Sequence, residues 1–263
     1  KKFNINDISS KVVNRNPSGP FTTSTLQQVS SGRLGFGASR TMQIAQKLYQ
    51  GIEIDGETIG LITYMRTDGT NLSTDAIDTF RKYIKNEFGD EYVPDNAASY
   101  SGKKAKNAQE AHEAIRPTDI MRAPDTVKKY LSPDQHKLYD LIWSRALSSQ
   151  MKPAQFDRNT ITINSDDNGT ICKASGSVIK FDGFLKVMKD TKKDDDEDIL
   201  PEMNKGPVNI EALLDEQHFT QPPPRYSEAS LVKKLEELGI GRPSTYASII
   251  SVISTRGYAE AIN

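Results

Sequence analysis

Gly60-Leu-Ile-Thr-Tyr64-Met-Arg66-Thr-Asp68-Gly69 is the stretch on which the fold and the function of this chain depend. Side chains alternate between the two faces of a β-strand, so a strand here would place Tyr64, Arg66 and Asp68 on one face. A tyrosine oxygen can attack phosphorus, and a neighbouring guanidinium can stabilise the charge that develops on phosphoryl oxygens. The same pattern is typical of an ordinary amphipathic strand, so the stretch alone leaves a catalytic and a structural interpretation open.

The composition restricts where a nucleic-acid site could lie. The 263 residues suggest one large domain or two of ordinary size, and the formal net charge is only −1. Nucleic-acid binding would therefore need a local concentration of Arg and Lys. The single cysteine, Cys172, excludes an internal disulfide framework and a cysteine-rich zinc site. With neither a signal-peptide pattern nor an apolar run of about 18 residues, we expect a cytoplasmic protein without membrane insertion.

Helical signals surround the opening stretch. Ser24 and Gln27 have the spacing of a capping box, which predicts a helix that starts near Ser24. Ser39 can cap a second helix. The dipeptide Asp55-Gly56 then predicts a β-hairpin that leads into the opening stretch. Two helices followed by a hairpin are typical of a winged-helix domain.

Two further helices and a β-rich region follow. Ser73 caps a helix that ends at Gly89, and Ser132 forms a second capping box with Gln135. From Phe156 the pattern alternates, which predicts a hairpin of residues 160–164 with 170–174 and a β-rich region that continues through 178–181, 184–187 and 208–213. The acidic run at 194–198 is interpreted as a solvated loop rather than a metal site.

The last segment predicts a second helical pair. Pro222-Pro-Pro224 indicates a boundary, after which a helix starts at Ser227 and ends at Gly239. Ser244 or Thr245 then starts the second helix. An Arg and hydroxyl groups beside a helix N-terminus suit a phosphate, and ordinary capping explains the hydroxyls equally well.

The chain resembles bacterial type IA DNA topoisomerase I along nearly its whole length. The segments that carry the resemblance are Phe21-Thr-Thr-Ser-Thr-Leu-Gln-Gln28, Arg33-Leu-Gly-Phe-Gly37, the opening stretch, Glu110-Ala-His112-Glu-Ala-Ile-Arg116-Pro117, Ser227-Glu-Ala-Ser-Leu-Val232 and Gly239-Ile-Gly-Arg242-Pro-Ser244-Thr245-Tyr-Ala-Ser-Ile-Ile250. The resemblance implies an isomerase that breaks one DNA strand through a 5′-phosphotyrosyl intermediate, passes another strand and relaxes negative supercoils without ATP.

The same resemblance implies roles for individual residues. Tyr64 would be the nucleophile, and Arg66 would stabilise the transition state. His112 would hydrogen-bond a phosphate of the bound strand. Arg116 would contact a phosphate or pair with Glu113, and the sequence leaves both open. The remaining candidates for contact with single-stranded DNA are Arg33, Arg242, Ser244 and Thr245.

The resemblance also implies what this chain lacks. Type IA enzymes bind Mg²⁺ through an N-terminal toprim domain, for which the sequence has no counterpart, so we expect no metal or other cofactor in this chain. The chain by itself would then be catalytically incomplete. Its partner would be single-stranded or negatively supercoiled DNA. The protein would be a monomer associated with the nucleoid in the bacterial cytoplasm.

The implied architecture is an α+β core fragment. A β-rich arch domain would comprise residues 1–16 and 152–221, and a helical CAP-like domain with Tyr64 would be inserted in it over 17–151. Residues 225–263 would begin a helical single-strand-binding domain. The alternative is a non-enzymatic winged-helix DNA-binding module in which Tyr64 is structural. That alternative explains the helices but not the pairing of Tyr64 with Arg66.

Overall fold

The computed structural model describes residues 2–100, 112–167, 169–188, 200, 203–212 and 214–260. The expected loop at 194–198 and the start of the 110–117 motif lie outside these residues. The chain divides into two compact units. We call residues 1–16 and 153–224 the sheet unit, and residues 17–152 and 225–263 the helical unit.

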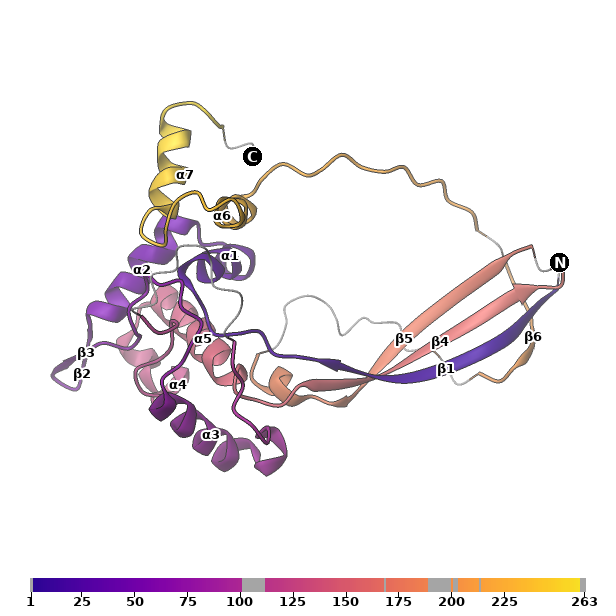
Figure 1. Cartoon of the computed structure of the whole chain (residues 1–263), viewed down its shortest axis with the longest axis horizontal. Helices are drawn as coiled ribbons and strands as arrows, with labels where there is room; N and C mark the ends of the chain where they lie inside the picture. The colour runs from indigo at the N-terminus through magenta and orange to yellow at the C-terminus, as the bar shows by residue number, and fades with distance from the viewer. Residues whose placement is uncertain are drawn as a thin grey trace. The chain divides into compact units, whose positions relative to one another are not determined.

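The sheet unit is built on long antiparallel strands that lie side by side in Figure 1. Its four-stranded sheet has the order β5-β4-β1-β6. The strands are β1 (Phe3–Arg15), β4 (Ala154–Ser165), β5 (Ile171–Phe181) and β6 (Gly206–Val208). The expected hairpin is therefore present as β4 and β5; β4 extends beyond the predicted 160–164 at both ends, and β5 starts one residue later than predicted and continues to Phe181.

The β-rich region ends sooner than the sequence suggested. Residues 184–187 do not form a strand, because the chain turns at Gly183, whose φ is 51°, into the short 3₁₀ helix η3 (Gly183–Lys186). Phe184 and Met188 are buried there. Of the described residues 208–212, only Val208 belongs to a strand, at the end of β6.

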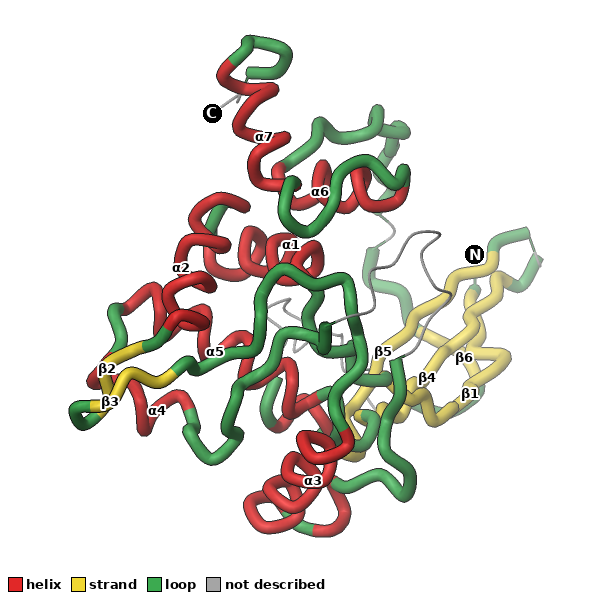
Figure 2. The backbone as a smooth tube through the Cα atoms, turned by 60° about the vertical axis from the view of Figure 1, so that its left-hand side comes forward, coloured by secondary structure: helices red, strands yellow, loops and turns green. Residues whose placement is uncertain are grey.

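The helical unit contains most of the helices and one small hairpin, as Figure 2 shows. Before residues 60–69 it contains α1 (Thr23–Leu34), α2 (Ala38–Gln50), β2 (Ile52–Ile54) and β3 (Glu57–Ile59). After them come α3 (Thr74–Phe88), η1 (Asp90–Tyr92), α4 (Pro124–Val127), η2 (Lys128–Tyr130), α5 (Pro133–Ser148), α6 (Glu228–Glu237) and α7 (Tyr246–Thr255). The predicted order of two helices and a hairpin is observed.

The caps of α3 and α5 were predicted correctly, and that of α1 was placed two residues too late. Ser73 accepts a hydrogen bond from the Ala76 amide, and Ser132 forms its capping box with Gln135, as expected. The capping box of α1 was misplaced, since Thr22 and Thr25 form it. The Ser24 hydroxyl instead donates to the Glu236 carboxylate on α6, at 2.6 Å.

The cap of α2 also comes from a distant residue. Gly37 occupies the N-cap position and has no side chain to offer, and Ser39 does not cap the helix. The Glu228 carboxylate accepts from the Ala38 amide at 2.7 Å. A carboxylate at a helix N-terminus is favourable because the free amides and the helix dipole present partial positive charge there.

Apolar packing holds the helical unit together. Leu138, Ile142 and Ala146 on α5 are fully buried, as are Leu26 on α1 and Leu48 on α2.

None of the described helices has the length and apolarity that crossing a bilayer requires.

The C-terminal helices pack on α1 and α2. Ala38 of α2 forms a buried cluster with Val232 of α6 and with Tyr246 and Ile250 of α7. We expected residues 225–263 to begin a separate domain, but in the structure they belong to the same compact unit as α1 and α2. This packing determines where the turn between α6 and α7 lies.

Candidate active site

The segment that carries Tyr64 is not a strand. Among residues 60–69, only Ile62 forms a β-bridge, an isolated one with Pro117. The expected alternation of side chains is nevertheless partly present. Leu61 and Met65 are fully buried, whereas Tyr64, Arg66 and Asp68 line a common pocket. Ile62 departs from the pattern, since only 1% of it is exposed.

Hydrogen bonds to a neighbouring segment replace the missing sheet on one side of Tyr64. The Thr63 hydroxyl donates to the Ala114 carbonyl at 2.8 Å and accepts from the Arg116 amide at 3.0 Å. The Thr63 amide donates to the Arg116 carbonyl at 2.9 Å. The backbone immediately before Tyr64 is therefore held against residues 114–116.

The first turn of α1 holds the other side. The Thr23 hydroxyl donates to the Met65 carbonyl at 2.7 Å and accepts from the Thr67 amide at 2.9 Å. The Thr23 amide donates to the Thr67 carbonyl, also at 2.9 Å. Sequence reasoning missed Thr23 because nothing in a run of threonines distinguishes a capping hydroxyl from one that binds a distant loop.

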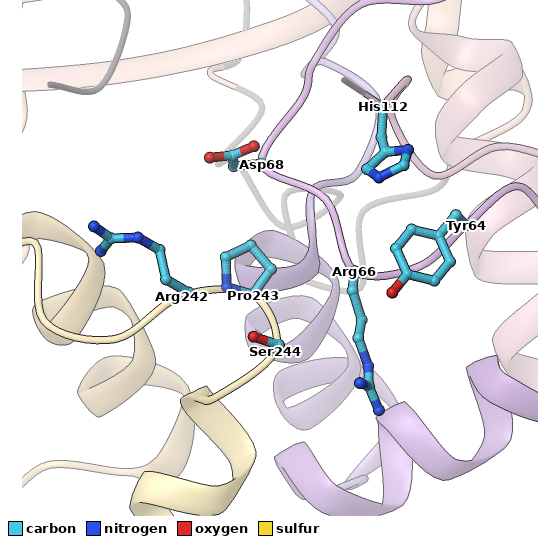
Figure 3. Close-up of a pocket in the computed structure, with 7 residues that line it drawn as sticks. All are labelled: Tyr64, Arg66, Asp68, His112, Arg242, Pro243 and Ser244. Carbon is cyan, nitrogen blue, oxygen red and sulfur yellow. The ribbon is translucent and has the colours of Figure 1, made fainter. Parts of the chain in front are cut away.

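The pocket joins three segments of the helical unit. Its volume is about 190 Å³, and it is lined by Tyr64, Arg66, Asp68, His112, Arg242, Pro243 and Ser244. In Figure 3 the turn between α6 and α7 faces the segment of Tyr64 across this pocket, and His112 comes from a third segment. Five of the predicted site residues therefore meet: Tyr64, Arg66, His112, Arg242 and Ser244.

Aromatic side chains flank Tyr64. The ring of Tyr49, near the C-terminus of α2, meets it edge-on, with centroids 5.4 Å apart. The imidazole of His112 lies on it in a tilted arrangement, with centroids 5.0 Å apart. The segment with His112 comes this close because residue 69 is glycine, since a Cβ there would collide with the His112 carbonyl oxygen. These contacts restrict the rotation of the phenol.

The charges around the pocket suit an anion. Two guanidinium groups and one carboxylate line it. Arg66 is exposed, and its side chain forms no hydrogen bond or ion pair with the residues that the structure describes. Arg242 is also exposed, and its Nη1 donates to the Gly241 carbonyl at 2.6 Å. A phosphate could therefore approach both groups without displacing an acidic partner.

The pocket does not fit a divalent cation. Mg²⁺ prefers several oxygen ligands, and Asp68 is the only carboxylate among the lining residues. Across the described parts of the chain, no three His, Cys, Asp or Glu side chains are grouped as metal ligands.

Arg116 lies outside the pocket. Its Nε and Nη2 donate to the two carboxylate oxygens of Glu113 at 2.8 and 3.2 Å, and its Nη1 donates to the Pro117 carbonyl. Glu113 also accepts from the Ser73 amide, and its pKa is lowered, mainly by the hydrogen bond from Arg116. Of the two alternatives that the sequence left open, the structure therefore places Arg116 in the pair with Glu113.

Two other candidates also lie outside the pocket. Arg33 is in the last turn of α1. Thr245 occupies the N-cap position of α7, but its side chain does not cap the helix. The Thr245 hydroxyl accepts instead from the Arg242 amide at 2.8 Å. It thereby fixes the turn from which Arg242 and Ser244 reach the pocket.

Sequence comparison gives the family. A family model described as DNA topoisomerase matches residues 1–263. The chain belongs to the DNA topoisomerase family. The expected resemblance to the bacterial type IA enzymes is confirmed, since the chain is 52% identical to DNA topoisomerase 1 of Rickettsia felis and 48% identical to DNA topoisomerase 1 of Salmonella typhimurium.

The matched region is one part of these topoisomerases. The alignments cover 99% and 100% of this chain but only 34% and 29% of the two relatives. The structure is similar to that of full-length topoisomerase I from Thermotoga maritima, with a TM-score of 0.87 and 40% identity, over 100% of this chain and 42% of that one. This match confirms the α+β fold class of a topoisomerase core fragment.

Proposed function

We propose that this chain supplies the tyrosine side of a type IA topoisomerase active site, with Tyr64 as the nucleophile. The observation that carries the proposal is that Tyr64 lines one pocket together with two arginines, Arg66 and Arg242. The tyrosine and Arg242 are far apart in sequence, so chance spacing in one motif does not explain their meeting. A structural tyrosine would not need an exposed arginine two residues away, and Arg66 has no side-chain partner within the part of the chain that the structure describes.

The chemistry follows from the groups in the pocket. The Tyr64 oxygen attacks a backbone phosphate of a single DNA strand, and the bond from phosphorus to the 3′ oxygen breaks. The phenol loses its proton as the new bond forms, and the leaving 3′ oxygen gains one. Arg66 would stabilise the charge on the phosphoryl oxygens, because its planar donors match phosphate geometry. Reversal of these steps reseals the strand.

The other pocket residues would hold the strand. His112 can donate a hydrogen bond to a phosphate beside the scissile one, and Arg242 and Ser244 can bind the backbone from the opposite wall. Mg²⁺ would be bound by residues outside this chain, since the described residues do not fit it. Relaxation of negative supercoils without ATP, by strand passage through the break, would belong to the longer protein.

A hybrid enzyme provides the test. In this hybrid, residues 1–263 replace the matched region of DNA topoisomerase 1 of Rickettsia felis. We expect the hybrid, incubated with Mg²⁺ and a single-stranded oligonucleotide labelled at its 3′ end, to yield labelled protein on a denaturing gel. An oligonucleotide labelled at its 5′ end should instead release a shorter free strand, because the tyrosine bonds to the 5′ phosphate of the downstream piece.

Two tyrosine variants serve as a matched pair. Tyr64→Phe should abolish the adduct while leaving DNA binding within about threefold, because the ring contacts remain and only the nucleophilic oxygen is lost. Tyr49→Phe removes the hydroxyl of the neighbouring ring and should still form the adduct. Adduct formation by the hybrid with Tyr64→Phe would refute the assignment.

Binding by the chain itself distinguishes the proposal from the winged-helix alternative. We expect residues 1–263 to bind a single-stranded oligonucleotide more tightly than the corresponding duplex in fluorescence anisotropy, and to relax no supercoiled plasmid with Mg²⁺. Tight sequence-specific binding to duplex, with no adduct from the hybrid, would favour the non-enzymatic module. Relaxation by the chain alone would show that its active site is complete.

A further inference from the structure

We propose that Thr23, at the start of α1, is a positioning residue for cleavage: its hydroxyl fixes the backbone on both sides of Arg66 and thereby sets where Tyr64 and Arg66 lie. The inference rests on the proposed function of Tyr64. Thr23 itself lines no part of the pocket. It would act through the loop and not through contact with DNA.

The contacts form a closed arrangement around one residue. The hydroxyl gives its single proton to the Met65 carbonyl at 2.7 Å and accepts the Thr67 amide at 2.9 Å. The amide of Thr23 donates to the Thr67 carbonyl at 2.9 Å. Arg66 lies between these two anchored peptide groups. The bonded backbone therefore determines the position from which Arg66 lines the pocket.

Burial makes these bonds consequential. Thr23 and Met65 are wholly buried, and Thr67 is 2% exposed. Water cannot readily replace a lost partner there, so loss of the hydroxyl would leave the Met65 carbonyl and the Thr67 amide without partners. The loop would have to move to satisfy them. Such a movement carries Tyr64 and Arg66 with it.

The helix does not need this hydroxyl for its own start. The side chains of Thr22 and Thr25 form the capping box of α1. Thr23 follows the cap, where a helix has free amide groups and no need of a side-chain acceptor from that residue. Its hydroxyl is therefore available to the loop. A role confined to helix capping does not account for the contacts that it makes.

Thr63 and Thr23 hold different parts of the loop, and Thr23 holds the part that contains Arg66. Thr63 fixes the chain before Tyr64 by binding Ala114 and Arg116. Among the described residues, the side-chain hydrogen bonds to the backbone of residues 65–67 all come from Thr23. Without the Thr23 hydroxyl, the chain would remain fixed before Tyr64, and the backbone after Tyr64 would keep the bond from the Thr23 amide to the Thr67 carbonyl but lose those at Met65 and at the Thr67 amide.

The experiment compares two substitutions in the hybrid enzyme. Thr23→Val keeps the shape and removes the hydroxyl, whereas Thr23→Ser keeps the hydroxyl. We expect Thr23→Val to lower the rate of adduct formation by about 10- to 100-fold with little change in the Kd for single-stranded DNA, because a displacement near 1 Å can cost that much in rate. Thr23→Ser should restore most of the rate.

Thr41 supplies the matched control for simple loss of a buried hydroxyl. It is also wholly buried in the helical unit, and its hydroxyl lies within hydrogen-bonding distance of Ser30 and the Phe36 carbonyl. Thr41→Val should lower the thermal stability to a similar extent while leaving the cleavage rate close to that of the unsubstituted hybrid. All rates are compared at a temperature where circular dichroism shows each variant to be fully folded.

The outcomes separate this proposal from the one on which it rests. An unsubstituted hybrid that forms no adduct would overturn the proposed function. An active hybrid in which Thr23→Val cleaves as fast as Thr41→Val would overturn the role of Thr23 alone. An equal loss in Thr23→Val and Thr23→Ser would also overturn it, since the hydroxyl would then not be the group that matters.

Discussion

Arg116→Ala should destabilise the helical unit and leave DNA binding almost unchanged. Arg116 is 14% exposed and forms two hydrogen bonds with the Glu113 carboxylate, at 2.8 and 3.2 Å. A hydrogen bond to a charged group contributes about 1.5–3 kcal/mol. Glu113 is 36% exposed, so solvent screening reduces the value, and the Ser73 amide still binds the carboxylate after the substitution. We therefore expect a loss of about 1.5–2 kcal/mol in the free energy of unfolding.

Thermal unfolding followed by circular dichroism measures this loss. For a unit of this size, about 2 kcal/mol corresponds to a Tm lower by roughly 5 °C. Arg122→Ala is the matched control, because Arg122 pairs with Asp119 at the same separation of three residues but at 3.4 Å and with both side chains about one-third exposed. That pair should contribute at most about 1 kcal/mol.

The pH dependence adds a second check. The hydrogen bond from Arg116 lowers the pKa of Glu113 in the folded chain. The pair therefore stabilises the fold at pH values above the pKa that Glu113 has in the unfolded chain, and this contribution is lost as the pH falls through the pKa of the folded chain. The difference between the parent chain and Arg116→Ala should shrink below about pH 4. Equal Tm values for Arg116→Ala and Arg122→Ala, or a tenfold loss of single-strand binding by a fully stable Arg116→Ala, would refute the assignment of Arg116 to the ion pair.

Two further predictions concern the packing of the helical unit. Val232→Ala removes two methyl groups from the cluster that joins α6 and α7 to α2, so it should cost about 2 kcal/mol and accelerate amide hydrogen exchange in α6 and α7 by about 30-fold. Val252 is exposed, so Val252→Ala should change neither the stability nor the amide exchange appreciably. Equal exchange rates in the two variants would contradict the packing of α6 and α7 on α2. Burial raises the pKa of Tyr100 to about 12, so stability should fall as the pH rises from about 10 towards that value. Tyr100→Phe loses the hydrogen bond to the Ser149 carbonyl, so it should be less stable than the parent chain at pH 8. Its free energy of unfolding should fall less between pH 8 and pH 11 than that of the parent chain. An equal fall in both would show that Tyr100 does not cause the pH dependence.

Local patterns predicted the elements whose signals lie within a few residues. The capping box of Ser132 with Gln135, the Ser73 cap and the β4–β5 hairpin are all present. Each depends on interactions between neighbours along the chain or on a simple alternation. Such patterns are visible in the sequence because the partners are separated by fixed, short intervals.

Signals that depend on distant partners were misread. Ser24 and Gln27 had the spacing of a capping box, but the carboxylate of Glu236 on α6 takes the Ser24 hydroxyl. Ser39 suited a cap for α2, yet Glu228 satisfies the Ala38 amide. A hydroxyl can bind any acceptor within reach, and its local spacing does not show which acceptor the fold brings near.

The sequence by itself determined the family, the α+β class and the pair of Tyr64 and Arg66 on which the proposed chemistry depends. The family and the class follow from the resemblance that the quoted motifs carry, and the pair follows from residue types and their spacing. The tertiary structure decided that residues 60–69 are an anchored loop and not a strand, and that Arg242 and Ser244 meet Tyr64 while Arg116 pairs with Glu113. The reason is physical: Thr23, Thr63 and the packing of α6 and α7 act across the chain, and contacts of that kind exist only after folding.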